Sequence, residues 1–210
     1  MKQKTKNTNS LIKFDTDWWN NACVNYSDNP WNLYARGYHD ALEVLIEHLL
    51  ENSSATIDTL VYPVIFLYHQ YLELRLKEII LLGNKLLERP YKISKEHNIA
   101  RLWRTARLLL QEIEPNGSKI DLDAIEVIIK EFSSVDPESM TFRYPVNLDG
   151  SPTLEPNITH INIRNFADVM GEVISNLEGM SVMISVYQGY QDEQNSYYQQ
   201  ENSEYQDDYY

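Results

Sequence analysis

Three polar side chains that could do chemistry, His69, Glu73 and Lys77, stand four residues apart in a mainly apolar stretch. On a helix this spacing places them in one stripe, with Glu73 before Lys77 in the favourable order for an ion pair. A histidine and a carboxylate one turn apart could also be two metal ligands, but a metal site needs further ligands. No Cys/His cluster supplies them, so we expect a structural polar network and no metal site.

A second group of residues has the types that phosphate chemistry needs. An imidazole can transfer a proton, and a guanidinium can stabilise a charged phosphate. The candidates of these types are His97, Arg101, Arg104 and Arg143. We expect the arginines that follow Ile99 to form a solvated helix face, and Arg143 to anchor its loop to a carboxylate such as Glu131 or Asp136.

The signature motifs of cofactor and catalytic sites are absent from the sequence. There is no P-loop, dinucleotide fingerprint, Gly-x-Ser-x-Gly elbow or His-Glu-x-x-His zinc helix. The chain has only seven glycines, and loops that bind phosphate through their backbone are rich in glycine. We therefore expect no cofactor, and the sequence leans away from an enzyme.

Apolar residues at spacings of three and four predict five helices that must position these side chains. Asn29 suits an N-cap and Pro30 the first helical position, so the first helix should start there. The second, at about 57–87, is apolar around most of its circumference and should lie at the centre of a bundle. The third has its apolar face from Ile99 on, the fourth follows the turn at 114–117, and the last runs through 163–184.

The chain divides into an N-terminal arm (1–28), an all-α five-helix bundle domain (29–186) and a tail (187–210). Within the domain, residues 133–159 are predicted to form one long irregular loop with a hairpin turning at Asp149-Gly150. The 3-4 spacing of the last helix predicts bundle core, and a seam between two copies of the protein is the alternative.

Tryptophans and tyrosines outside the predicted core are the candidates for interactions. Trp18 and Trp19 are predicted to pack onto the domain as part of the arm, with a partner-binding patch as the alternative. The tail has no aliphatic residue and is predicted to be disordered. It ends in two further interaction candidates, Tyr209 and Tyr210.

Composition indicates a soluble protein of the cytoplasm. A chain of 210 residues can bury a core without disulfides, and its single cysteine, Cys23, favours a reducing compartment. No apolar core of a signal peptide follows the N-terminal lysines. The longest apolar stretch, 60–82, contains charges that would be costly in a bilayer, so we expect no membrane contact.

The formal net charge of −13 does not favour RNA as a partner, because phosphate binding depends on clustered Lys and Arg. The charge is uneven, however. From Tyr187 onward the chain has six acidic residues and no basic one. The tail thus accounts for almost half of the net charge, and the bundle is only mildly acidic.

Two segments, Tyr71-Leu-Glu-Leu-Arg-Leu-Lys-Glu-Ile-Ile80 and His97-Asn-Ile-Ala-Arg-Leu-Trp103, resemble the HEPN superfamily of small helical bundles. The resemblance implies a HEPN-like bundle, a tendency to dimerise, and a setting in antiviral defence, CRISPR or toxin–antitoxin systems. Many members are metal-independent ribonucleases that use Arg, four to six residues, then His. No histidine here has an arginine at that spacing before it: Arg164 begins such a motif, but Val169 and Met170 stand where His is wanted.

Three functions follow as alternatives. The first is a non-catalytic HEPN-like subunit that acts through protein association, with a homodimer as one form, in a bacterial defence or toxin–antitoxin system. The second is an atypical ribonuclease that uses His97 with Arg101 or Arg104, or Arg143. The third is a regulator that acts through its acidic, tyrosine-rich tail. Under the first, His97 is expected to bond to backbone at a helix start, and Glu73 and Lys77 to brace adjacent helices.

Overall fold

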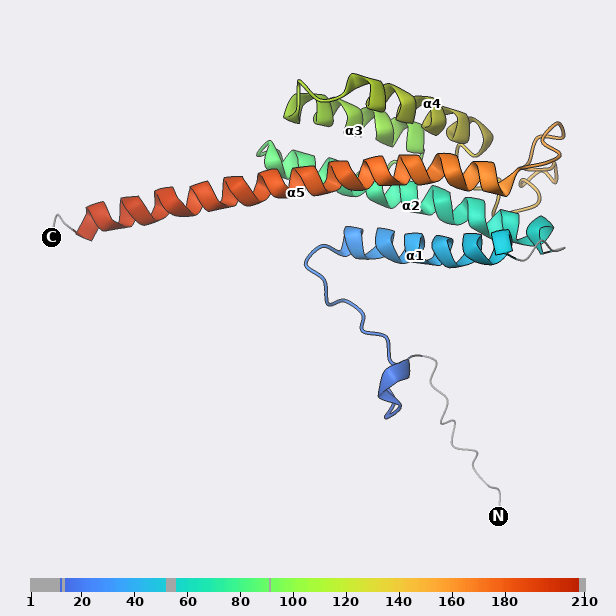
Figure 1. Cartoon of the computed structure of the whole chain (residues 1–210), viewed down its shortest axis with the longest axis horizontal. Helices are drawn as coiled ribbons and strands as arrows, with labels where there is room; N and C mark the ends of the chain where they lie inside the picture. The colour runs from blue at the N-terminus through green and yellow to red at the C-terminus, as the bar shows by residue number, and fades with distance from the viewer. Residues whose placement is uncertain (1–11, 13, 52–55, 91, 208–210) are drawn as a thin grey trace, which may run out of the picture. The chain divides into compact units, whose positions relative to one another are not determined.

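The computed structural model describes residue 12 and residues 14–51, 56–90 and 92–207. These residues form a short 3-10 helix, η1 (Trp18–Asn20), five α-helices and no strand. The α-helices are α1 (Pro30–Glu51), α2 (Ile57–Leu86), α3 (Ile99–Ile113), α4 (Lys119–Val135) and α5 (Ile163–Asp207). The predicted all-α bundle is therefore confirmed (Figure 1).

The helix starts follow local capping chemistry. α1 begins at Pro30, directly after Asn29, as predicted. The side chain of Asn98 accepts a hydrogen bond from the backbone N–H of Arg101 (3.1 Å) at the start of α3. Ser118 accepts from the N–H of Asp121 (3.4 Å) at the start of α4. Each cap satisfies a backbone donor that the first helical turn leaves free.

Contacts between the helices fix their directions. Asn32 and His39 of α1 lie against Arg75 and Tyr71 of α2 in reversed order, so α1 is antiparallel to α2. α5 runs parallel to α2, because Phe166 packs on Tyr68 near its start and Gln188 bonds to Leu82 further along.

α3 also runs parallel to α2. His97, just before α3, contacts Glu73 in the middle of α2, whereas Glu112, near the end of α3, pairs with Arg89 after the end of α2. The connection of residues 87–98 must therefore return along the bundle before α3 begins. α4 is antiparallel to α3, because Asn98 at the start of α3 bonds to Pro137 just after α4.

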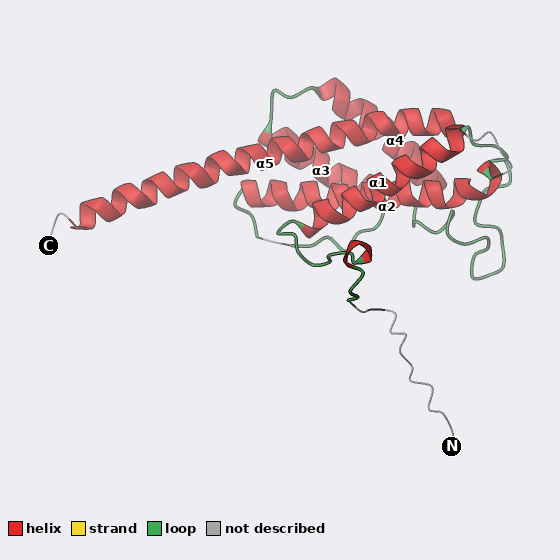
Figure 2. Cartoon of the chain, turned by 60° about the horizontal axis from the view of Figure 1, so that its bottom comes forward, coloured by secondary structure: helices red, strands yellow, loops and turns green. Residues whose placement is uncertain are grey.

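α2 is the central helix, as its apolar circumference predicts. It packs against α3 on one side and α5 on another, and its side chains Leu72, Leu76 and Ile79 have no exposed surface. α1 adds the buried residues Ala35 and Leu42 to the same core. Figure 1 and Figure 2 show the other helices arranged around α2.

The segment between α4 and α5 is the predicted long loop. Asp136 starts it by accepting hydrogen bonds from the backbone N–H groups of Met140 (2.8 Å) and Thr141 (2.9 Å). The loop reverses at Asp149-Gly150, where Asn147 N–H bonds to the Ser151 carbonyl (2.8 Å) and Gly150 has φ +84°. Glycine adopts this left-handed conformation without strain, so the predicted turn is confirmed.

The predicted disorder of residues 187–210 is not confirmed, because α5 continues as a helix to Asp207. A helix that is already nucleated adds residues at little cost, and the bundle supplies that nucleus. Figure 1 and Figure 2 both show the last part of α5 running past the ends of the other helices. Tyr209 and Tyr210 lie outside the described residues.

The N-terminal arm is a separate compact unit that ends at Pro30. Its side chain Asn21 closes a small turn: Asn21 Nδ2 donates to the carbonyl of Asp15 (2.7 Å), and Asp15 N–H donates to Asn21 Oδ1 (2.9 Å). Trp18 packs edge-on against Phe14 at 5.7 Å, and Trp19 is exposed. Their packing onto the bundle stays a prediction.

Candidate functional site

The polar stripe of α2 lies inside the bundle. Lys77 Nζ donates a hydrogen bond to Glu73 Oε1 at 2.8 Å, and both side chains are more than nine-tenths buried. The same carboxylate oxygen lies 3.0 Å from Nδ1 of His97, whose side chain is 66% exposed. Glu73 therefore joins α2 to the segment that precedes α3, whereas its pair with Lys77 lies within α2.

His97 makes a different contact from the one expected. It was predicted to bond to neighbouring backbone, but Asn98 is the capping residue and Glu96 accepts from the backbone N–H groups of both His97 and Asn98, each at 3.0 Å. The N–H of Asn98 is the main cause that lowers the pKa of Glu96. The His97 ring contacts Glu73 instead. The sequence alone does not show that these two residues lie close together in the fold.

His69 is the buried end of the stripe. Its ring has no exposed surface and packs edge-on against Phe132 at 5.7 Å. Among the described residues, neither ring nitrogen has a partner in hydrogen-bond geometry. Burial lowers the pKa of His69, and the carboxylates of Asp136 and Glu73 oppose that shift. The ring is therefore neutral at pH 7, and it contributes to the stripe by packing.

A second buried charge cluster was not predicted from the sequence. Arg75 pairs with Glu78 inside α2, and its guanidinium also donates to Asn32 Oδ1 of α1 (3.0 Å). Arg75 Nε donates to the hydroxyl of Tyr71, which in turn donates to Glu178 of α5; both distances are 3.3 Å. Burial raises the pKa of Tyr71, so the hydroxyl stays protonated. The cluster ties α1, α2 and α5 together.

The sequence indicates that part of this cluster is buried, but it does not identify all of the partners. Arg75 and Glu78 are charges in a helix that is apolar around its circumference, and such charges must be buried with partners. Glu178 stands more than a hundred residues later, in the amphipathic part of α5. Nothing in the sequence alone indicates that it meets Arg75.

The arginines of α3 divide into bound and exposed groups. Arg107, which was expected on a solvated face, pairs with Asp123 and Glu126 and so links α3 to α4. Arg101 is exposed and lies 3.3 Å from Glu96. Arg104 is exposed and takes part in no ion pair with the described residues. Arg101 and Arg104 are three residues apart, so they share one face of α3.

Arg143 anchors its loop through aromatic rings and not through the predicted carboxylate. Its guanidinium lies 5.3 Å from the ring centre of Phe66 and 5.4 Å from that of Tyr144. Cation–π contacts of this kind are a common alternative to an ion pair for arginine. The structure therefore brings His97 and Arg101 together at the start of α3, and places Arg143 against Phe66, in the first half of α2.

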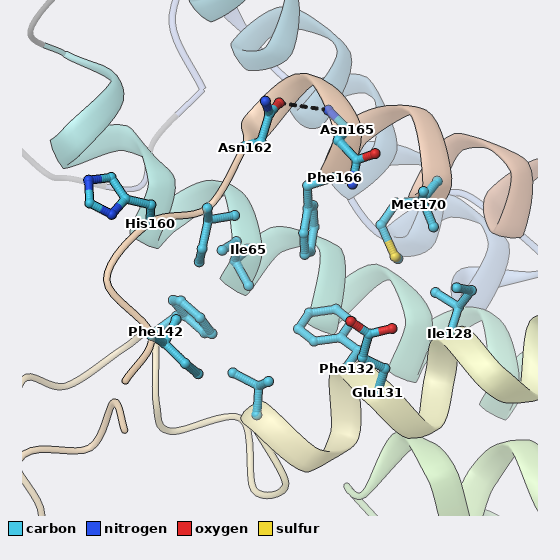
Figure 3. A pocket seen from close by; sticks show the side chains of 14 residues that line it. Ile65, Ile128, Glu131, Phe132, Phe142, His160, Asn162, Asn165, Phe166 and Met170 are labelled. Carbon is cyan, nitrogen blue, oxygen red and sulfur yellow. Dashed lines mark hydrogen bonds between the residues drawn. The ribbon is translucent and has the colours of Figure 1, made fainter. Parts of the chain in front are cut away.

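A pocket of about 320 Å³ lies where the α4–α5 loop meets α4 and the start of α5. Figure 3 shows Phe132, Phe142 and Phe166 around it, with the ring of His160 pointing away from them. Asn162 is occupied in capping α5, because its Oδ1 accepts from the N–H of Asn165 (3.0 Å). A ligand site usually directs several polar groups inward. This pocket is apolar and does not include the candidate catalytic residues.

The end of α5 is exposed from residue 192 to residue 200. Its last contacts with the bundle are Tyr187 to Glu114 (2.7 Å), Gln188 to the Leu82 carbonyl (2.6 Å) and Gln191 to Glu88 (3.2 Å). We call residues 192–207 the extension. Its tyrosines Tyr197 and Tyr198 are 72% and 65% exposed.

No family model, curated protein or solved structure matches the chain. One helical segment of the described residues, Ile163–Gln200, is long and apolar enough to cross a membrane on length and composition alone. Core helices of soluble proteins meet the same criterion, and the stripe of α5 that includes Met170 and Leu177 is buried in the bundle.

The chemistry of the described residues is therefore mostly internal. No group of three or more potential metal ligands occurs among them. The buried charges of α2 are taken up in pairs within that helix, and the exposed His97 and Arg101 line no described pocket. What the surface offers instead is the uncovered helix of the extension.

Proposed function

We propose that this chain is a non-catalytic, HEPN-like helical subunit that acts through association with protein partners in a bacterial defence or toxin–antitoxin system. The observation that carries the proposal is the extension of α5. Sixteen residues of helix continue beyond the last described contact with the bundle, and Tyr197 and Tyr198 among them are exposed. Exposed tyrosines on a rigid element are typical of interfaces.

The arrangement of candidate catalytic residues supports association over catalysis. The nuclease motif of the family is absent, and His97 and Arg101 are each engaged with a glutamate at the start of α3. The buried pairs Glu73–Lys77 and Arg75–Glu78 lie within α2, and Glu73 and Arg75 also contact residues of other segments. The HEPN-like assignment itself rests on the two sequence segments quoted above and on an all-α bundle that is compatible with it.

Co-purification from the native host tests this function. The full chain and a chain that ends at Gln191 are compared, each with the same tag at the N-terminus. We expect the full chain to retain a partner in fixed stoichiometry and the shortened chain to lose most of it. Equal capture by both chains, or no stoichiometric partner with either, would count against the proposal.

The ribonuclease alternative has its own test on the same preparations. His97 lies 3.0 Å from Glu73, a contact that could orient an imidazole for proton transfer, and Arg101 is nearby through Glu96. Under the proposed function, the purified chain shows no RNA cleavage that His97→Ala or Arg143→Ala removes. Cleavage that either substitution abolishes would replace the proposal by the enzyme.

A further inference from the structure

We infer that the pocket between α4 and the start of α5 binds a small aromatic molecule that carries a protonated amine. The inference goes beyond the proposed function, which depends on the extension, so each can fail without the other. It is carried by three features of the pocket: its aromatic walls, its size, and a carboxylate without a partner at its mouth.

The walls of the pocket are apolar and aromatic. Ile65 of α2 and Met170 of α5 line it and are at most 2% exposed. The rings of Phe132 and Phe166 meet edge-on with their centres 5.7 Å apart, and Phe142 of the loop also lines the pocket (Figure 3). Walls of this kind favour a ligand with an apolar or aromatic body.

The size of the pocket limits that body to a small molecule. Its volume is about 320 Å³. A cavity of about 150 Å³ is enough to hold one benzene molecule. The pocket therefore has room for one or two fused rings with a short side chain.

The segment 158–161 is the part of the wall through which a ligand can enter. It borders this pocket and also a second hollow of about 290 Å³. Its hydrogen bonds are local: Ile158 N–H donates to the carbonyl of Glu155 (3.0 Å), and His160 Nδ1 lies 3.0 Å from Thr159 Oγ1. Because these bonds do not reach the helices, this segment moves at a lower cost than the helical walls.

The polar groups at the mouth determine the charge of the ligand. Glu131 and Asn165 are exposed and line the pocket from α4 and α5 (Figure 3). Among the described residues, the carboxylate of Glu131 has no hydrogen-bond or ion-pair partner. No lysine or arginine of the described chain lines this pocket. An anionic ligand would meet a like charge here, whereas an amine pairs with the carboxylate and also interacts with ring faces.

The start of α5 does not offset this preference. A helix N-terminus attracts anions through backbone N–H groups that have no partner. Here Asn162 accepts from two of these groups: its Oδ1 from the N–H of Asn165 (3.0 Å), and its carbonyl from the N–H of Phe166 (2.9 Å). The carboxylate of Glu131 therefore determines which charge the mouth favours.

Binding of three matched probes to the full chain tests the inference, by isothermal titration calorimetry at pH 7. Tryptamine carries an indole ring and a protonated amine, indole-3-propionate carries the same ring and a carboxylate, and indole is neutral. We expect tryptamine to bind at least about tenfold more tightly than indole-3-propionate, because the two charges act with opposite sign at Glu131. Indole should lie between them.

Two substitutions assign the binding to this pocket. Glu131→Lys should reverse the order, so that indole-3-propionate binds more tightly than tryptamine. Val169→Phe enlarges a half-buried side chain that lines the pocket and should weaken all three probes at least about tenfold. The matched control is Glu172→Lys, which changes an exposed glutamate of α5 that does not line the pocket and should keep the natural order.

Thermal unfolding followed by circular dichroism shows that each variant is folded before it is titrated. A natural chain that does not bind tryptamine, or an order of the probes that the folded Glu131→Lys chain leaves unchanged, would overturn the inference. A chain that fails this test and still captures a host partner contradicts only the pocket and leaves the proposed function standing.

Discussion

At the scale of single residues, the pair of Glu73 and Lys77 is buried, and removing both charges from water has a cost in free energy. Two charges that are taken out of water stabilise a fold only while both are present, because each satisfies the other. Here the pair is supplemented by the ring of His97, which also contacts the carboxylate. The pair is therefore a structural element first, although its residue types would suit catalysis.

Lys77→Met tests this role. The substitution keeps the volume of the side chain but leaves the buried carboxylate of Glu73 with His97 alone. We expect the free energy of unfolding to fall by about 3–5 kcal/mol, as measured by urea denaturation at pH 7. The matched double variant, Glu73→Leu with Lys77→Met, should lose clearly less. A loss below about 1 kcal/mol in the single variant would show that the pair is not needed.

His69 makes stability depend on pH. Burial lowers its pKa in the folded state, whereas in the unfolded chain the pKa is about 6.5. The unfolded state then binds more protons as pH falls through 6.5 toward the folded value. The contribution of His69 to stability is full above about pH 6.5 and is lost as the solution is acidified.

The free energy of unfolding, measured between about pH 7.5 and pH 5, tests whether stability falls on acidification. The natural chain should lose stability faster on acidification than His69→Phe, which keeps a ring beside Phe132 but cannot take up a proton. Parallel curves for the two chains would mean that His69 titrates as it does when unfolded.

At the scale of elements, α5 consists of a packed part and an unpacked part. Up to Gln191 its side chains bond to Glu114, the carbonyl of Leu82 and Glu88. Beyond that residue α5 continues as a helix to Asp207, and its side chains Tyr197 and Tyr198 are exposed. Helix of this kind contributes surface rather than stability.

Two truncations separate the parts. A chain that ends at Gln191 should keep the stability of the full chain within about 0.5 kcal/mol, when both are measured at high salt where association is screened. A chain that ends at Val186 also loses the bonds of Tyr187, Gln188 and Gln191, and we expect it to be about 1–3 kcal/mol less stable. Equal losses in both would contradict this division of α5.

Much of the fold could be predicted because helix periodicity and capping are local. Asn29-Pro30, the face from Ile99 and the central helix near 57–87 all depend on residues that are close in sequence. The helical end of α5 was not predicted, because a segment without aliphatic residues cannot build a core and was therefore expected to be disordered. That argument does not consider that a helix already packed in the bundle can continue into such a segment.

The site was harder to predict than the fold. The pair Glu73–Lys77 is one helical turn apart and was found, whereas its third member, His97, reaches Glu73 only because residues 87–98 return along the bundle. Arg75 meets Glu178 across more than a hundred residues for a similar reason. Contacts between residues so far apart in the sequence depend on how the helices pack. A single sequence does not show this packing.

At the scale of the whole molecule, the charge of −13 is a sum of unlike parts. The C-terminal part from Tyr187 is purely acidic, while the α2–α3 connection and the start of α3 gather exposed cations. Charges of opposite sign on separate parts of the surface favour association with a partner of complementary charge. Such association is sensitive to salt, because exposed charges are screened within about 10 Å at 0.1 M salt.

Hydrogen exchange of the extension tests the central claim most directly, since an uncovered helix exchanges quickly and an interface protects it. The chain is measured alone at low and high concentration, and again in the complex purified from the host. We predict that amides of residues 192–207 exchange more slowly in the concentrated or partner-bound chain, while those around Glu73 are unchanged. Equally fast exchange of the extension under all these conditions would contradict a role in association.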